Sequence, residues 1–243
     1  MRETRVFENL DQLSKAAAEL FVEIGARSIA GRGRFAVALS GGSTPESLYK
    51  LLGSKQFRSS LDWTKAVFFF GDERNVQRDS PESNYRMANE TLFASLPLEH
   101  DSVHEWPTYE LVPEKIAQDY AREIEHFFQG FPRFDLVLLG LGSDGHTASL
   151  FPNTNALRKT DEIAVANWVP KLNDHRFTLT FPVLNNAANL IFLVSGKEKA
   201  ETVATVLEGE FRPDEWPAQF VQPRDGNLYW LLDESSASKL PQI

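Results

Sequence analysis

The sequence contains no cysteine, and this absence excludes several classes of protein. Without thiols there is no disulfide framework, no thiolate metal site and no cysteine nucleophile, and a reducing compartment is permitted. Long apolar runs are also missing, since none approaches the roughly 20 residues that a membrane helix requires. Residues 1–11 lack the apolar core of a signal peptide. We therefore expect a cytoplasmic protein with no membrane partner.

An excess of positive charge is lacking too, because 25 Lys and Arg face 34 Asp and Glu, for a formal net charge of -9. A surface of this sign repels nucleic acid on average, so we expect no nucleic-acid partner and a local group of donors for any anionic ligand. The 243 residues, 42% of them hydrophobic, can build one substantial core. We predict a single domain over residues 1–243.

Short apolar runs alternate with segments of helical spacing along the chain. The runs are typical of parallel strands buried on both faces, and they cover residues 35–39, 66–70, 135–139 and 190–194. Helices are predicted over residues 10–29, 45–52, 83–93, 113–128 and 197–207. The alternation predicts an α/β fold with a doubly wound, mainly parallel, Rossmann-like sheet and helices on both faces. Ligands bind such sheets where loops leave the carboxyl ends of strands.

The loop after the first predicted strand has the residues of an anion site. Gly41 and Gly42 permit close approach of the backbone, the hydroxyls of Ser43 and Thr44 can donate, and a helix N-terminus offers free N–H groups. The Lys-Ser/Thr pair of a nucleotide-binding P-loop is absent, which argues against ATP or GTP. The alternative interpretation is an ordinary strand-to-helix turn capped by Ser43 or Thr44.

The loop after the second predicted strand carries Asp72, Glu73 and Arg74. Carboxylates in this place can orient a polyol, and a guanidinium can stabilise developing anionic charge. The alternative interpretation is an exposed charged turn that is closed by a surface ion pair. Residues 71–74 are a candidate site mainly because they directly follow a predicted strand.

The loop after the third predicted strand contains a misleading glycine pattern. Gly140, Gly142 and Gly145 satisfy the dinucleotide motif GxGxxG. That motif must open a long helix, whereas Pro152 follows within a few residues and would break one. We therefore predict that this loop does not bind NAD.

Asp144 and His146 remain as the chemistry-bearing side chains of that loop. Ser143 directly follows a glycine, so the GxSxG spacing of a hydrolase nucleophile is not met. A histidine titrates near neutral pH and can take a proton from water, while a nearby carboxylate can orient it. The alternative is a histidine that is merely hydrogen-bonded to loop carbonyls.

Taken together, in this order and spacing, the loops resemble the 6-phosphogluconolactonase family. That family, related to glucosamine-6-phosphate deaminase, has a Rossmann-like parallel sheet and uses no metal and no cofactor. The matching segments are LSGGSTPESLY (39–49), FFGDERNV (69–76), ESNYRMANETLF (82–93), LGLGSDGHTASLFP (139–152), HRFTLTFPVLNNA (175–187) and SGKEKA (195–200).

The resemblance implies a metal-independent carboxylic ester hydrolase of the oxidative pentose phosphate pathway. Its substrate partner would be a sugar-phosphate lactone, 6-phospho-D-glucono-1,5-lactone, hydrolysed to 6-phosphogluconate. Deaminases of the wider group carry a glutamate five residues after the histidine, where this chain has Phe151, which favours the lactonase. The alternatives are a glucosamine-6-phosphate deaminase or isomerase and a non-catalytic sugar-phosphate sensor.

The resemblance also implies roles for the candidate catalytic residues. His146 would be the general base that activates water, and Asp144 would orient His146 or a sugar hydroxyl. Arg74 would stabilise the oxyanion or bind phosphate, and Asp72 would support the site. No metal ligand is expected.

For the substrate phosphate, the resemblance implies the loop of Gly41, Gly42, Ser43 and Thr44 together with two basic side chains. These are Arg176 and Lys199, and the neighbouring Lys197 could take the place of Lys199. The sequence predicts no oligomeric state.

Overall fold

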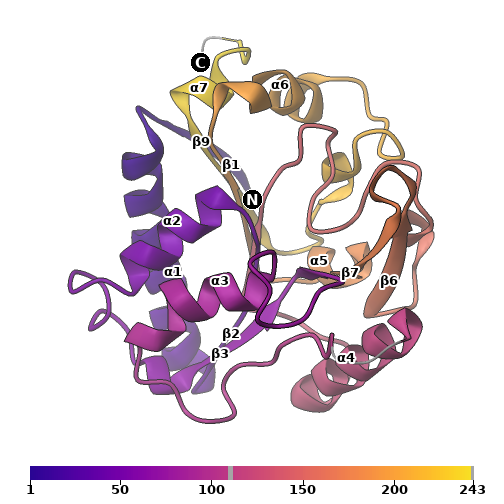
Figure 1. Cartoon of the computed structure of the whole chain (residues 1–243). Coiled ribbons are helices and arrows are strands. Elements are labelled where there is room, and N and C mark those ends of the chain that lie inside the picture. Colours follow the sequence, from indigo (N-terminus) through magenta and orange to yellow (C-terminus); the bar gives the residue numbers. More distant parts are fainter. Residues whose placement is uncertain (109–111, 242–243) are drawn as a thin grey trace.

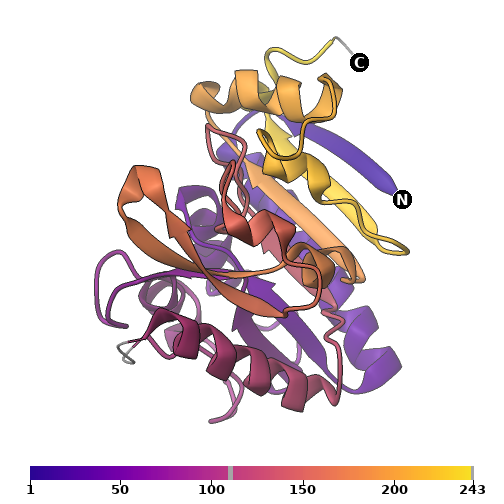
Figure 2. The same ribbon diagram turned by 90° about the vertical axis from the view of Figure 1, so that its right-hand side faces the viewer.

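The computed structural model describes residues 1–108 and 112–241, which form two β-sheets with helices around them. The larger sheet has six parallel strands in the order β1-β9-β8-β5-β2-β3, and the smaller has three antiparallel strands in the order β4-β7-β6 (Figure 1). Figure 2 shows the smaller sheet on one side of the larger. The strands are β1 (Arg2–Phe7), β2 (Phe35–Leu39), β3 (Ala66–Phe70), β4 (Asp72–Arg74), β5 (Leu136–Leu139), β6 (Ala164–Val169), β7 (Asp174–Leu179), β8 (Asn189–Val194) and β9 (Asn227–Asp233).

Helices cover both faces of the larger sheet. They are α1 (Leu10–Arg32), α2 (Ser43–Leu52), α3 (Asn84–Thr91), α4 (Pro113–Phe128), α5 (Phe181–Asn185), α6 (Ala200–Glu208) and α7 (Glu234–Ala237). In Figure 1, α1 and α2 lie together on one side of the sheet, whereas α4 lies on the other side and packs against β6 and β7. The predicted α/β class with a mainly parallel sheet is thereby confirmed.

The strand order places a topological switch point between β2 and β5. From β2 the chain continues to β3 at one edge of the sheet, whereas from β5 it continues to β8 and β9 in the opposite direction. The loops after β2 and β5 therefore diverge at the carboxyl end of the sheet. Such a divergence leaves a crevice in which open α/β sheets bind their ligands.

Local sequence explains how α1 begins and ends. The Asn9 side chain accepts a hydrogen bond of 3.0 Å from the backbone N–H of Gln12, and this caps the first turn. Gly33 ends the helix in the left-handed conformation, at φ +75°, which a glycine adopts without steric cost. The helix extends to Arg32, three residues beyond the predicted end.

Most of the other predicted elements agree with the structure to within one or two residues. The strands at 35–39 and 66–70 have the predicted bounds, and so does the helix at 113–128. The segment predicted as a helix over 197–207 begins instead with a 3-10 turn, Lys197–Lys199, before α6. Neither the edge strand β1, nor β9, nor the smaller sheet was predicted from the sequence.

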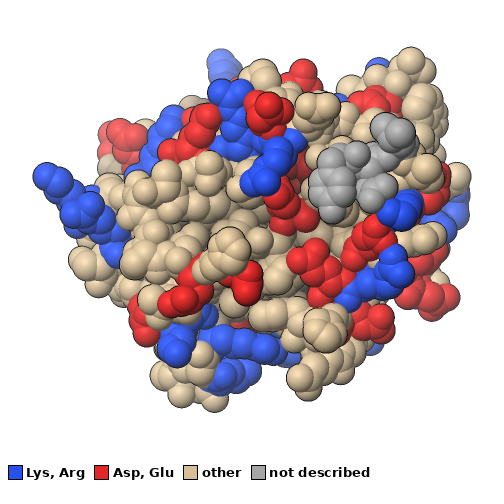
Figure 3. Space-filling view, turned by 60° about the horizontal axis from the view of Figure 1, so that its bottom comes forward, with Lys and Arg blue, Asp and Glu red and all other residues tan. Residues whose placement is uncertain are grey.

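The buried apolar side chains form one continuous cluster between the sheets and helices. Every side chain of β2 and β5 is buried, as the apolar runs predict for strands covered on both faces. Side chains of both signs are interspersed over the face shown in Figure 3. In the part of the chain that the structure describes, no helix is long and apolar enough to cross a membrane.

Candidate active site

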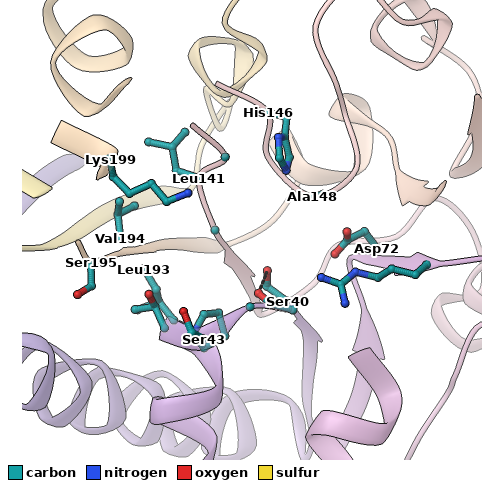
Figure 4. Close-up of a pocket in the computed structure, with 17 residues that line it drawn as sticks. Ser40, Ser43, Asp72, Leu141, His146, Ala148, Leu193, Val194, Ser195 and Lys199 are labelled. Atoms are coloured by element: carbon teal, nitrogen blue, oxygen red, sulfur yellow. Dashed lines mark hydrogen bonds between the residues drawn. The ribbon is translucent and has the colours of Figure 1, made fainter. Parts of the chain in front are cut away.

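A cavity of about 220 Å³ opens at the switch point, between the loops that follow β2 and β5. Four segments line it, and Figure 4 shows their side chains converging from different elements. They are residues 40–45, which include the first turn of α2; Asp72 and Arg74 of β4; the loop 140–148 after β5; and the end of β8 with the turn that leads to Lys199. Three loops chosen from the sequence thus meet in one place.

The N-terminus of α2 forms one end of the cavity. Gly42 precedes the helix at φ +102°, and no side chain caps the first turn. The first N–H groups of a helix have no partner within it, so this uncapped turn can bind an anion. A methyl group on Gly41 would lie 1.9 Å from Oδ1 of the buried Asn84, so only glycine fits there.

Lys199 lies on the same side of the cavity as Ser43 (Figure 4). The turn before it is fixed by Asp233, whose carboxylate accepts hydrogen bonds from Ser195 Oγ at 2.7 Å and from the Gly196 N–H at 3.1 Å. Burial by itself raises the pKa of Asp233, but the hydrogen bonds from Ser195, Ser236 and Gly196 outweigh it and lower that pKa. Lys197 does not line the cavity, so the geometry favours Lys199 over Lys197.

His146 reaches the cavity from a tight loop. The backbone N–H of Gly142 donates to the His146 carbonyl at 2.8 Å, and Gly145 adopts φ +80° against Trp216. The imidazole stacks on Phe151 with the ring centres 4.1 Å apart, and 27% of the side chain stays exposed. Between this loop and β6, residues 149–163 contain no helix except the 3-10 turn 155–158. The glycines of the GxGxxG pattern therefore do not open a long helix, as predicted.

Asp144 is the partner of the imidazole. Its Oδ1 contacts His146 Nδ1, and its Oδ2 pairs with the ammonium of Lys171. Partial burial favours a raised pKa, but His146 and then Lys171 outweigh it and hold the pKa of Asp144 well below its usual range. Because Nδ1 faces Asp144, the Nε2 atom is left for contact with a substrate or water.

Asp72 and Arg74 belong to a strand, so the alternative of an exposed charged turn is wrong. Residues two apart in a strand point to the same face, and both side chains line the cavity. Asp72 is only 8% exposed and accepts a hydrogen bond of 2.7 Å from Ser149 Oγ. Its other oxygen lies 3.4 Å from Asn84 Nδ2.

Glu73 points the opposite way and has a structural role. It accepts hydrogen bonds from the backbone N–H groups of Asn84 at 2.8 Å and Tyr85 at 2.9 Å, and so caps the start of α3. Burial raises the pKa of Glu73 against the lowering effect of these donors. The cap holds Asn84 between Gly41 and Asp72.

Arg176 is not brought to the cavity. It lies opposite Arg74 in the β4–β7 register, but its guanidinium donates to Asp174 Oδ2 at 2.8 Å and to the His175 carbonyl at 3.0 Å. It is not among the residues that line the cavity. Its role in phosphate binding therefore stays a prediction without geometric support.

Residues that hold the candidate side chains in place were not predicted from the sequence. Asn84 and Ser149 lie inside the matched segments 82–93 and 139–152, but neither was assigned a role. Lys171 lies outside every matched segment, and only the folded chain brings it to Asp144. Among residues 1–108 and 112–241, no group of three His, Asp or Glu side chains could hold a metal ion.

Known proteins that are similar to this chain carry the name 6-phosphogluconolactonase. The sequence model described as glucosamine-6-phosphate isomerases/6-phosphogluconolactonase matches residues 8–230. A 6-phosphogluconolactonase of Synechocystis sp. is 43% identical over 219 residues, which are 88% of each chain. The 6-phosphogluconolactonase of Homo sapiens is 39% identical over 97% of this chain and 92% of its own.

A solved structure of 6-phosphogluconolactonase from Trypanosoma brucei superposes with a TM-score of 0.88. It is 31% identical, and the match covers 99% of each chain. The sequence match and the shared fold extend over nearly all of the chain, including every segment that lines the cavity. The chain therefore belongs to the glucosamine-6-phosphate isomerase/6-phosphogluconolactonase family.

Proposed function

We propose that this protein hydrolyses 6-phospho-D-glucono-1,5-lactone to 6-phosphogluconate, the reaction named by its relatives. The observation that carries the proposal is the convergence of an uncapped helix N-terminus and an imidazole in one cavity. The substrate has a group that suits each end of the cavity. Its phosphate would bind the α2 N-terminus and Lys199, and its lactone would lie beside His146. This activity would place the protein in the oxidative pentose phosphate pathway.

In the proposed mechanism, His146 Nε2 accepts a proton from water as the water oxygen attacks the lactone carbonyl carbon. The resulting tetrahedral oxyanion collapses and breaks the bond between that carbon and the ring oxygen. The imidazolium returns its proton to the departing ring oxygen, which becomes a hydroxyl group. The new carboxylic acid then ionises and releases one proton to solvent. No step requires a metal, a cofactor or a covalent intermediate.

Arg74 and Asp72 lie at the lactone end in this proposal. Figure 4 shows Asp72 across the cavity from Lys199, with His146 between the two sides. Arg74 shares the cavity-facing side of β4, so its guanidinium is assigned to the oxyanion rather than to the phosphate. Asp72, fixed by Ser149, would accept hydrogen bonds from sugar hydroxyl groups.

Phe151 favours hydrolysis over deamination. Its ring covers one face of the His146 imidazole, in the place where the resemblance gives the deaminases a glutamate. The carboxylate beside the imidazole is that of Asp144, which is already paired with Lys171. Position 151 therefore offers no carboxylate that could open the ring of an amino sugar, as deamination would require.

A turnover assay on two substrates tests the function. Freshly prepared 6-phosphogluconolactone should be hydrolysed well above its spontaneous rate, followed by proton release in a weakly buffered solution. Glucosamine 6-phosphate should release no ammonia under the same conditions. Ammonia release would instead establish a deaminase, and saturable binding of phosphosugars without turnover of either compound would indicate a sensor.

We expect Lys199→Met to raise the KM for 6-phosphogluconolactone about tenfold or more, with a smaller change in kcat. A charge-assisted contact to phosphate contributes about equally to the bound substrate and the transition state, so its loss weakens binding. Steady-state kinetics measure both constants. Lys197→Met is the matched control, because Lys197 does not line the cavity, and its KM should stay that of the unaltered protein. The reverse pattern would assign the phosphate to Lys197.

A further inference from the structure

Lys171 reaches the His146 loop from the smaller sheet. It lies in the 3-10 turn Pro170–Leu172 that joins β6 to β7, and Asn173 closes this turn at φ +49°. The pair Trp168 and His175, edge to face with 5.0 Å between ring centres, closes the hairpin below it. The turn thus places Lys171 beside the site.

The Lys171 ammonium has two contacts there. It pairs with Asp144 Oδ2 and lies 4.6 Å from the centre of the Phe151 ring, the ring that stacks on His146. A cation over an aromatic face is attracted by the ring. Lys171 therefore touches both of the side chains that hold the imidazole, although it is not among the residues that line the cavity.

We propose that Lys171 is a positioning residue for the His146 base, which rests on the proposed function. By occupying Oδ2 it leaves only Oδ1 of Asp144 to face His146 Nδ1, and this fixes the carboxylate and the ring. Its positive charge also offsets the charge of Asp144. A bare carboxylate would favour the imidazolium form, which cannot accept a proton from water.

The effect on pH follows from the charges around the imidazole. Asp144 and Lys171 belong to its contact network, and Asp72, Arg74 and Lys199 share its cavity. Removal of Lys171 takes away one positive charge and leaves the others in place. The imidazolium is then favoured over the neutral ring, so the acid limb of the rate profile should move to higher pH.

The test uses Lys171→Met, which keeps an unbranched apolar stem as far as the ε position and removes the ammonium group. We expect kcat to fall about three- to tenfold at the plateau, with KM changed less than twofold because Lys171 does not contact the cavity. Lys171→Arg, which keeps the charge, should restore the position of the acid limb. Lys159→Met is the matched control, since Lys159 pairs with Glu162 away from the site and should change neither constant.

Titration of His146 by NMR of the imidazole nitrogens gives a readout that does not depend on turnover. A raised midpoint in Lys171→Met, with the rate profile moved in parallel, supports the proposal. An unchanged midpoint together with an unmoved acid limb overturns it, whatever happens to kcat. If the unaltered protein fails to hydrolyse the lactone, the proposed function fails, while the midpoint still reports whether Lys171 acts on His146.

Discussion

His146→Gln should lower kcat for 6-phosphogluconolactone hydrolysis by about 10²- to 10⁴-fold, with KM changed severalfold at most. Positioned general bases contribute rate factors of this size, and glutamine has similar bulk but cannot accept the proton. The α2 N-terminus and Lys199 are untouched in the variant, so the phosphate should still bind. Proton release at several substrate concentrations, corrected for spontaneous hydrolysis, measures both constants.

The result can be separated from a loss of structure. His100→Gln is the matched control, because His100 is exposed and is not among the residues that line the cavity, and it should keep full activity. The circular dichroism spectrum of His146→Gln should match that of the unaltered chain. A His146→Gln protein that folds and retains its kcat would remove the imidazole from the mechanism and leave the catalytic base unassigned.

The buried parallel strands were predictable because their apolar runs have one physical cause, burial on both faces. The smaller sheet was not, because the strand from Asp174 to Leu179 begins with three charged or polar residues and gives no such run. β9 was missed although it met the criterion, since Leu228 to Leu232 is apolar throughout and buried. β1 is an edge strand with Arg2, Glu3 and Arg5, and its composition is that of a surface segment.

Candidate chemistry was easier to predict than the residues that support it. His146, Arg74 and Lys199 follow strand ends, and the carboxyl edge of a parallel sheet brings such positions together whatever the loops do in detail. Arg176 was placed by resemblance alone, and the fold turns its guanidinium to Asp174 instead. The contact of Lys171 with Asp144 joins residues 27 apart through a hairpin that no apolar pattern indicates.

Gly142→Ala should lower kcat by about 100-fold without unfolding the protein. A Cβ atom at this position would lie 2.0 Å from His146 Nδ1 and 2.8 Å from Asp144 Oδ1, closer than non-bonded atoms approach. The backbone of Gly142 is outside the left-handed region, so alanine causes no backbone strain at this position. The clash must be relieved by movement of the His146 and Asp144 side chains. To relieve the 2.0 Å contact the imidazole has to move by more than an ångström from its present place on the Phe151 ring. Displacements of this size in catalytic groups cost rate factors of that order.

Gly71→Ala is the matched control for this steric argument. Gly71 also follows a strand of the larger sheet, but an added Cβ would meet only the Leu39 carbonyl oxygen, at 3.4 Å. Its kcat should therefore stay within a fewfold of the unaltered value. Thermal unfolding of both variants, with kinetics on the lactone, makes the comparison. If Gly142→Ala keeps its kcat, the imidazole does not need the position it has beside Asp144, and the geometry on which the general-base mechanism depends is wrong.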